Sequence, residues 1–486
     1  MATVLGIGIA SLFAIVTPRA EAAVSFLGVA AGDASSTSAT LWTRATPANT
    51  TLGLEITTNK NFAKHITKIS NVCITDPTQD STCKSRIVNL SPQTVYYYRF
   101  VAPTGETSNV GRVKTAPKPS QRASLRFAFS GDYDGLIRPY ALASVIPSQK
   151  LDFYVSLGDV IYETASDLTL SGPHNGEPWL QSPSVTLSGP AATLNGDPND
   201  TAVANTCRNN TTWATQAQLK IDYEEKYREQ FLPVNTGGQN SLQTLYAAQG
   251  AYTTYDNHEL GNRQYINGGA PAGGPVGGAT FNDMATGCGV DARNNGTGNP
   301  GNANDVNDSP TDYMNRATGF RTLQNVFLSY QPIADRGVVS APGDPRTDGT
   351  KQLYSAHKWG KNAIYINTDT RSYRDLRLKT SNGAADDTTA PRANNPGRTY
   401  LGATQLAWLK QTLLDAQHAK TRWKFVSLSD PIDQIGPIGG ALALSNLPCF
   451  YIVGCKPDGS PVSGPAYSPV NSDGGKSYIG GYRWER

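Results

Sequence analysis

The residues best suited to chemistry are an aspartate and a tyrosine that follow a short apolar run. The sequence GDVIY, residues 158–162, comes directly after the apolar run LDFYVSL. An aspartate at a strand end can bridge two cations, and a tyrosine three residues later can reach one of them as a phenolate, a hard donor suited to Fe(III). The alternative is an ordinary aspartate turn beside a packed tyrosine. The spacing predicts Asp159 and Tyr162 as metal ligands.

Three further motifs supply side chains of the same kind. Asp132 ends the preceding apolar run, and its carboxylate is placed to bind the same metal. In YDNHE, residues 255–259, Asn257 offers an amide oxygen to a second cation, and His258 can donate to phosphoryl oxygens or to the leaving group. Arg371 can clamp phosphate with two hydrogen bonds, or else form a structural pair with an aspartate.

These motifs give one set of predicted site residues. The expected metal ligands are Asp132, Asp159, Tyr162 and Asn257, and the expected catalytic residues are His258 and Arg371. Of the five histidines, only His258 lies in a cluster of ligand-type residues. Surface or packing roles are expected for the other four: His65, His174, His357 and His418.

The elements that must position these residues are strands alternating with helices. Each motif follows one of five β-type runs, which are LRFAF, LDFYVSL, GAYTT, NAIYINT and WKFVSLS. Helical patterns cover residues 223–231 and 404–417, and the second predicts one apolar face made of Leu406, Leu409, Leu413 and Leu414. Such alternation predicts an α/β sheet, whose ligand sites gather at the carboxyl ends of its strands.

An all-β unit is predicted in front of the α/β part. Residues 24–117 contain short β-branched and aromatic runs at intervals of roughly ten residues, with turn residues between them. The turn LSPQT at residues 90–94 precedes alternating tyrosines, and this resembles the tyrosine corner of fibronectin type III domains. We therefore expect a small fibronectin-III-like sandwich at 24–117 and a catalytic domain at 118–486.

The N-terminus and the bulk composition bear on location and partners. Residues 4–16 form a continuous apolar stretch of 13 residues, too short to span a membrane but suited to a signal peptide. A cleavage site follows at residues 20–22, which predicts a signal peptide over 1–23 and a secreted, periplasmic or cell-surface protein; a buried helix is the alternative. The net charge of +3 comes without a Lys/Arg run, so the sequence has no nucleic-acid binding motif.

The six cysteines agree with export. An even number of cysteines in an exported chain favours disulfides, whereas the alternative, a zinc site, has no CxxC or paired histidines to support it. Their positions in the sequence suggest three local pairs, which are Cys73/Cys83, Cys207/Cys288 and Cys449/Cys455.

Taken together, the motifs resemble the PhoD-like alkaline phosphatase/phosphodiesterase family, whose metallophosphoesterase core is similar to that of purple acid phosphatases. The segments that carry the resemblance are, in order, FAFSGDYDG, SLGDVIYE, YDNHE, DTRSYRD, LGATQLAWLKQTLLDAQ, WKF and GGYRWER. The resemblance implies a metallophosphoesterase-like layered sheet and an Fe(III)/Ca(II) site. It also implies hydrolysis of phosphomonoesters and phosphodiesters by metal-activated water, with His258 and Arg371 stabilising the developing charge.

Three departures from the family pattern are visible. Many members have a Cys ligand near the position of Asp132, and the family's twin-arginine signal is absent here. Members also continue after GGYRWER into a strand with Asp-x-His ligands, whereas this sequence ends at Arg486. The expectation from the residues present is a catalytic domain that lacks part of its metal shell and is a poor enzyme.

Two other functions compete with an alkaline phosphoesterase. One is a purple-acid-type acid phosphatase, and the other is a secreted binding protein without catalysis. Stoichiometric iron would favour an enzyme, and the absence of both metal and phosphate release would favour the binding protein. The expected partners are phosphate esters, either small molecules or polymers, and the protein is expected to be a monomer without a stable membrane span.

Overall fold

The fold was analysed in a computed structural model. It describes residues 22–133, 140, 143, 145–161, 216–231, 241–256, 258–260, 315, 318–374, 399–429, 435–437 and 478–479. Within this part of the chain, no helix is both long and apolar enough to cross a membrane.

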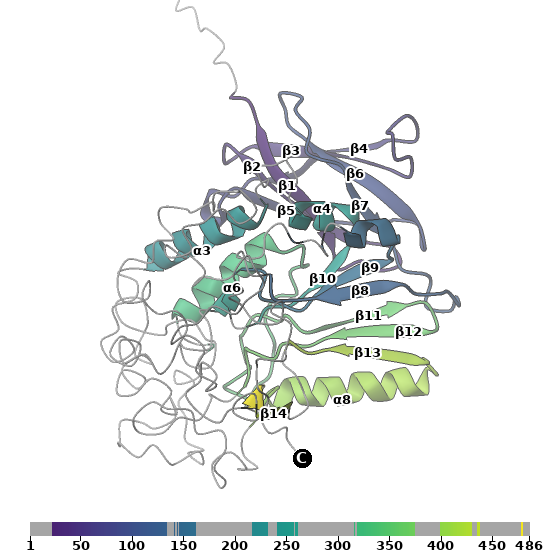
Figure 1. Cartoon of the computed structure of the whole chain (residues 1–486), viewed down its shortest axis with the longest axis vertical. Coiled ribbons are helices and arrows are strands. Elements are labelled where there is room, and N and C mark those ends of the chain that lie inside the picture. The colour runs from purple at the N-terminus through teal and green to yellow at the C-terminus, as the bar shows by residue number, and fades with distance from the viewer. Residues whose placement is uncertain are drawn as a thin grey trace, which may run out of the picture.

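The strands and helices follow one another in the order shown in Figure 1. The all-β N-terminal part contains β1 (Ser25–Gly32), β2 (Ala39–Thr46), β3 (Thr51–Thr57), β4 (Thr67–Ile74), η1 (Pro77–Gln79), β5 (Thr82–Ile87), β6 (Val95–Val101) and β7 (Gly111–Lys114). The mixed part begins with β8 (Phe127–Ser130), η3 (Ile146–Gln149), β9 (Phe153–Ser156), α3 (Gln216–Phe231), α4 (Ser241–Ala248), β10 (Ala251–Thr253) and η6 (His258–Leu260). It continues with α6 (Thr318–Tyr330), β11 (Ser355–Trp359), β12 (Ala363–Asn367), α8 (Ala403–His418), β13 (Trp423–Ser427), β14 (Ile435–Pro437) and β15 (Tyr478–Ile479).

The first seven strands form the predicted β-sandwich. One sheet has the order β4-β3-β6-β7, and the strands β5-β2-β1 face it across a core that includes Leu41, Leu54 and Phe100. The Ser91 amide donates to the Tyr96 hydroxyl over 2.8 Å, so a tyrosine hydroxyl does bond back to the predicted turn. A disulfide joins Cys73 of β4 to Cys83 of β5 and confirms that pair.

The other two predicted cysteine pairs lie outside the described residues, as does almost all of the predicted signal peptide. These are Cys207/Cys288, Cys449/Cys455 and residues 1–21.

The sandwich and the α/β part share a sheet. Strand β1 pairs in parallel with β10 at Gly32 and Ala251, which gives the six-stranded order β5-β2-β1-β10-β9-β8. Strands β10, β9 and β8 are parallel to one another, as the alternation of strands and helices predicted. The three runs that precede predicted site residues therefore end on the same edge of the sheet.

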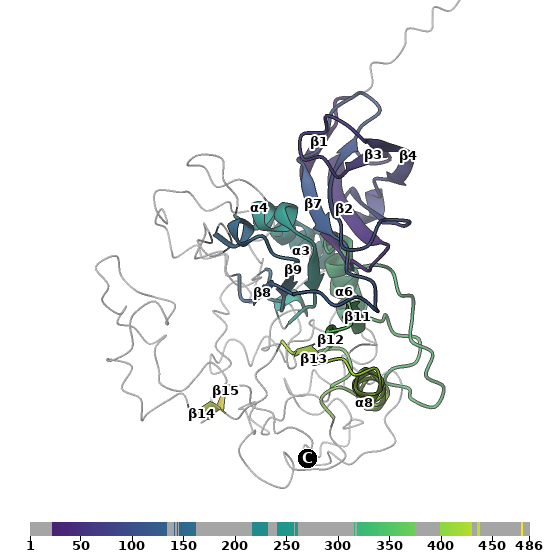
Figure 2. The ribbon, with the colours of Figure 1, turned by 90° about the vertical axis from the view of Figure 1, so that its right-hand side faces the viewer.

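A second sheet, β11-β12-β13, lies beside β8 and β9, with α8 along its outer side (Figures 1 and 2). An aromatic core joins the two sheets and includes Phe127, Phe153, Tyr252, Trp359 and Tyr365. The mixed α/β architecture is therefore confirmed, and it is built on two sheets.

The α8 helix covers Ile364 and Ile366 with Leu409, Leu413 and other side chains. The predicted apolar face of α8 is wrong at Leu414, which is 52% exposed. The helix touches β12 along a narrow stripe, and Leu414 lies beyond the edge of that stripe.

His357 has the packing role expected of it. It lies against the Tyr252 ring at 4.2 Å between centroids and hydrogen-bonds through Nε2 to the Ser355 hydroxyl over 2.9 Å. Burial lowers the pKa of His357 to about 4, although the Asp33 carboxylate at 3.5 Å acts in the opposite direction. The imidazole is therefore neutral in the folded protein at neutral pH.

The low pKa predicts that stability falls on acidification. Between pH 6.5, the ordinary histidine pKa, and about pH 4, His357 binds a proton in the unfolded chain but stays neutral in the folded protein. His357 should thereby lower the free energy of unfolding by up to about 3 kcal/mol across that range. Urea unfolding at pH 7 and pH 5 measures the effect, and the His357→Gln variant should lose less stability between the two. An equal loss in both proteins would contradict the assignment.

Candidate functional site

The turns after β8, β9 and β10 bring three predicted site residues together. The Tyr133 amide donates to the Asp159 carbonyl oxygen over 2.7 Å, so the turn that holds Asp132 is bonded to the turn that holds Asp159. The backbone amide of His258 donates to Asp159 Oδ1 over 3.0 Å. Parallel strand pairing thus places Asp132, Asp159 and His258 at one edge of the sheet, as their positions after apolar runs predicted.

The Gly-Asp sequence is required by the close approach of two turns. Gly158 has φ +102°, and a Cβ atom there would lie 2.3 Å from the Asp256 amide nitrogen. Only glycine can occupy that position without moving the neighbouring backbone. Asp132 and Asp159 also have left-handed backbones, with φ of 59° and 50°. Both carboxylates are thereby carried on tight turns rather than on the strands themselves.

A buried glutamate holds these turns in place. Glu259 accepts hydrogen bonds from the backbone amides of Asp159 at 2.9 Å, Val160 at 2.5 Å and Asp256 at 2.9 Å. Burial raises the pKa of Glu259 to about 7, against the lowering effect of these three bonds. Sequence reasoning gave this residue no role, and its one signal was its place at the end of the YDNHE motif.

The electrostatics of Asp159 are those of a buried acidic cluster. Burial raises the pKa of Asp159 well above its ordinary value; His258 lowers it, and the carboxylates of Asp256, Glu259 and Asp132 raise it further. A cation placed among these groups would relieve both the repulsion and the loss of hydration. The donor set therefore fits a hard metal ion bound through oxygen.

The described residues contain part of the predicted ligand set. Asp132 and Asp159 are described, whereas Tyr162 and Asn257 lie outside the described residues. Across the described ranges, no three His, Cys, Asp or Glu side chains are grouped so as to hold a metal by themselves. Tyr162 and Asn257 remain predicted ligands on sequence grounds.

Arg371 forms the aspartate pair that the sequence left as its alternative role. Its Nε donates to Asp256 Oδ1 over 2.5 Å, its Nη2 pairs with the same oxygen, and its side chain is only 5% exposed. This pair connects the motif after β12 to the motif after β10. The role of Arg371 toward phosphate stays a prediction.

A second link joins the same two motifs through Asp369. Its Oδ1 accepts from the backbone amides of Arg371 at 3.0 Å and Ser372 at 2.8 Å, and its Oδ2 accepts from the Tyr255 hydroxyl at 3.0 Å. Gln405 of α8 bonds both the amide and the carbonyl of Asp369, each over 2.8 Å. Gln405 was also missed, and its signal was a polar residue on a helix that otherwise packs through apolar side chains.

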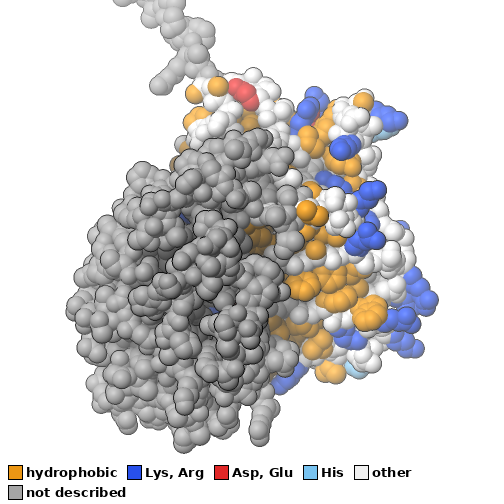
Figure 3. All heavy atoms as spheres, in the orientation of Figure 1, with side chains coloured by type: hydrophobic (Ala, Val, Ile, Leu, Met, Phe, Trp, Pro, Cys, Tyr) orange, Lys and Arg blue, Asp and Glu red, His pale blue; other side chains and the backbone are white. Residues whose placement is uncertain are grey.

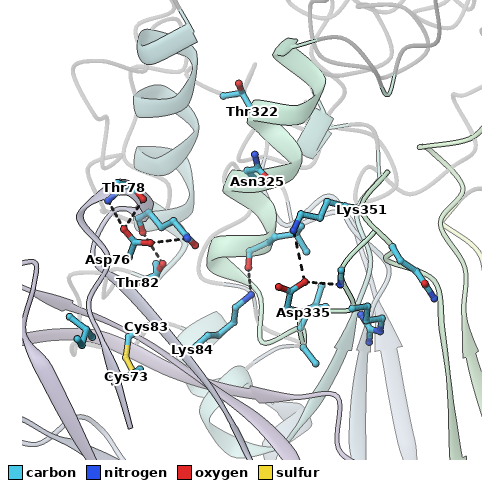
Figure 4. A pocket seen from close by; sticks show the side chains of 18 of the residues that line it. Cys73, Asp76, Thr78, Thr82, Cys83, Lys84, Thr322, Asn325, Asp335 and Lys351 are labelled. Atoms are coloured by element: carbon cyan, nitrogen blue, oxygen red, sulfur yellow. Dashed lines mark hydrogen bonds and ion pairs between the residues drawn. A yellow bond between two sulfur atoms is a disulfide. The ribbon is translucent and has the colours of Figure 1, made fainter. Parts of the chain in front are cut away.

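A separate cavity of about 610 Å³ lies between the sandwich and α6 and contains none of the predicted site residues. Figure 4 shows Lys84, Asp335 and Lys351 on its wall. Lys84 Nζ donates to the Leu328 carbonyl over 2.6 Å, and Lys351 lies 3.9 Å from the Asp335 carboxylate. Because its cations already have such partners, we interpret this cavity as a polar boundary between the sandwich and the α6 region.

Comparisons with known proteins agree with the resemblance to the PhoD-like family. The family model described as "PhoD-like phosphatase, N-terminal domain" matches residues 13–117, and the one described as "PhoD-like phosphatase" matches residues 300–478. Alkaline phosphatase D of Bacillus subtilis (strain 168) is 24% identical over 427 residues, which cover 84% of this chain and 58% of that protein.

A solved structure described as "Structure of PhoD" has the same fold. Its TM-score is 0.51 at 23% identity, over 82% of this chain and 61% of that chain. The chain spans about three fifths of the length of these two matches.

The contacts of Glu259 predict that its loss disrupts the site and the fold together. Glu259→Ala leaves three buried amides without an acceptor and should lower the free energy of unfolding by about 3–5 kcal/mol. Glu259→Gln retains one accepting oxygen and should cost less. Chemical denaturation measures both, with Asp415→Ala on the exposed surface of α8 as the control. A Glu259→Ala protein as stable as this control would contradict the assigned role.

Proposed function

Because the chain belongs to the PhoD-like phosphatase family, we propose that it is a metal-dependent phosphoesterase that hydrolyses phosphomonoesters and phosphodiesters. The observation that carries the proposal is the buried Asp159 carboxylate, beside which the turns of Asp132 and His258 are bonded. Two sheets packed through an aromatic core, with the site at the strand ends, support a metallophosphoesterase-like layered domain at 118–486. The Tyr96 bond supports a fibronectin-III-like sandwich at 24–117.

The carboxylates of Asp132 and Asp159, together with Tyr162 and Asn257, would hold the metal ions, which we propose to be Fe(III) and Ca(II). A phenolate suits Fe(III), and carboxylate and amide oxygens suit Ca(II). When bound, such ions supply Lewis-acid polarisation of phosphoryl oxygens and lower the pKa of water.

The chain's own residues would supply the remaining functions. His258 is half-buried, and the bond from its amide to Asp159 fixes its backbone beside the acidic cluster. From there its imidazole would donate a proton to the leaving oxygen. Arg371, held by Asp256, brings a fixed positive charge to the same edge and would stabilise the negative charge that develops on phosphoryl oxygens.

Export remains part of the proposal. The apolar stretch at residues 4–16 supports a signal peptide, and the Cys73–Cys83 disulfide supports an oxidising compartment. We propose that the protein acts as a secreted, periplasmic or cell-surface enzyme in phosphate scavenging.

The first test removes one charge at the centre of the site. Asp159→Asn keeps the size of the side chain but removes the anionic oxygen, so turnover of an aryl phosphodiester should fall by roughly a hundredfold or more. Bound metal, measured by elemental analysis, should fall with it. Asp415→Asn provides the same change on the exposed surface of α8. Wild-type turnover in Asp159→Asn would show that the site is elsewhere.

The second test identifies the metal through Tyr162. A phenolate bound to Fe(III) should give a visible charge-transfer absorption band, and Tyr162→Phe should remove it because the ligand oxygen is lost. Absorption spectra of the two purified proteins after iron loading provide the measurement. A colourless wild-type protein with full activity would count against iron.

A further inference from the structure

The end of the two sheets opposite Asp159 gathers segments that are distant in sequence. Residues 118–126 connect the sandwich to β8 and run beside residues 358–362, which comprise the end of β11 and the turn to β12. The segments are bonded to one another: Lys361 N donates to Gln121 O over 2.7 Å, Asn362 Nδ2 to Ala123 O over 3.2 Å, and Trp423 N to Asn362 O over 2.9 Å. Residues 148–150 join them because Arg126 Nη1 donates to Gln149 O over 3.2 Å.

We call this surface the basic end face and define it as residues 118–126, 148–150, 358–362 and 418–424. These four segments hold nine Lys or Arg residues and no Asp or Glu. The exposed cations are Lys118, Arg122, Arg126, Lys150, Lys358, Lys361, Lys420 and Arg422. In Figure 3, Lys and Arg side chains line the right-hand edge, where Figure 1 places these turns. Asp152, which follows one segment, is buried and paired with Lys114.

A groove runs between three of these segments. It has a volume of about 360 Å³ and is lined by residues 123–125, 362–363, 422–423 and Phe425. Trp423 forms one wall and is 58% exposed, and its ring stacks on that of Phe425 at 6.3 Å between centroids. The groove is partly apolar, Arg422 lines it, and Lys361 adjoins Asn362 of its lining in sequence.

We infer that the basic end face binds a linear polymer of phosphates along this groove. Eight exposed cations over four segments can together hold a ligand that carries several negative charges, whereas isolated surface charges bind single ions weakly. A phosphate chain supplies one charge or more per unit and is narrow enough to follow a groove.

The shape of the face and its few aromatic residues select this ligand over two others. A flat anionic membrane would meet protruding cations but leave the groove unfilled. Single-stranded nucleic acids are held by several aromatic side chains on which successive bases stack. Within the four segments the aromatic residues are Trp359, which is buried, and Trp423. Phe425, which also lines the groove, packs against Phe127 at the edge of the aromatic core, so Trp423 is the one strongly exposed aromatic ring among these residues. Charge therefore dominates this surface, and the ligand is recognised through its phosphates.

The face is distinct from the site around Asp159. It lies at the amino ends of β8, β9, β12 and β13, whereas the candidate site lies beyond the carboxyl ends of β8 and β9. Strands of four or five residues separate the two by roughly 13–17 Å. The inference therefore stands whether or not Asp159 takes part in phosphate ester hydrolysis.

The test measures binding of linear inorganic polyphosphate to the full chain by calorimetry at several salt concentrations. The variant Lys361→Ala with Arg422→Ala removes two cations beside the groove and should weaken binding roughly tenfold. It should also reduce the slope of log K against log salt concentration by roughly 1.5. The matched control is Lys60→Ala with Lys64→Ala, two exposed lysines of the sandwich, and it should bind as the wild type does. If the first variant does not fold, Lys118→Ala with Lys358→Ala replaces it.

Three outcomes would overturn the inference. The first is an equal loss of polyphosphate affinity in the variant of the basic end face and in the control variant. This would indicate attraction to the net charge of the protein alone. The second is binding that does not weaken with salt. The third is tight binding to anionic phospholipid vesicles or oligothymidylate, with none to polyphosphate, which would assign the face to a membrane or to nucleic acid.

Discussion

The candidate site depends on one buried carboxylate and the three backbone amides bonded to it. Glu259 connects the turn after β9 to the turn after β10, and without it both would leave unpaired amides in the interior. The backbones of Asp159 and Asp256 are fixed by the same side chain. Glu259 therefore positions the site, and in doing so it adds one more carboxylate to those of Asp132, Asp159 and Asp256.

The closeness of these carboxylates explains why many hydrogen bonds and ion pairs connect the site to neighbouring segments. Asp256 is paired with Arg371, and Asp369 accepts from Tyr255 and from two backbone amides. These bonds join the first sheet to the second sheet at the edge where the acidic cluster lies. A buried negative charge is stable only when such partners or a bound cation compensate its lost hydration.

Local patterns predicted the elements well because each reflects a local physical preference. The five runs that precede the motifs are β8, β9, β10, β12 and β13, and the helical patterns became α3 and α8. Local patterns gave the wrong burial for residues whose burial depends on tertiary contacts. Leu414 fits the apolar period yet is exposed, while Glu259 and Gln405 look like surface residues and are buried. Their roles depend on backbone amides supplied by other segments, which no periodicity encodes.

The sequence by itself determined which residue types follow the strands, and these motifs identified the family. The glycine at position 158 answers to both levels, because its positive φ belongs to the local Gly-Asp turn and the close approach of the Asp256 backbone is a tertiary contact. Only the tertiary structure decided that the sandwich shares a sheet with the α/β part, and that Arg371 is bound to Asp256. It likewise gathered isolated cations from four segments into one basic face, because strand pairing, and not sequence distance, determines which turns become neighbours.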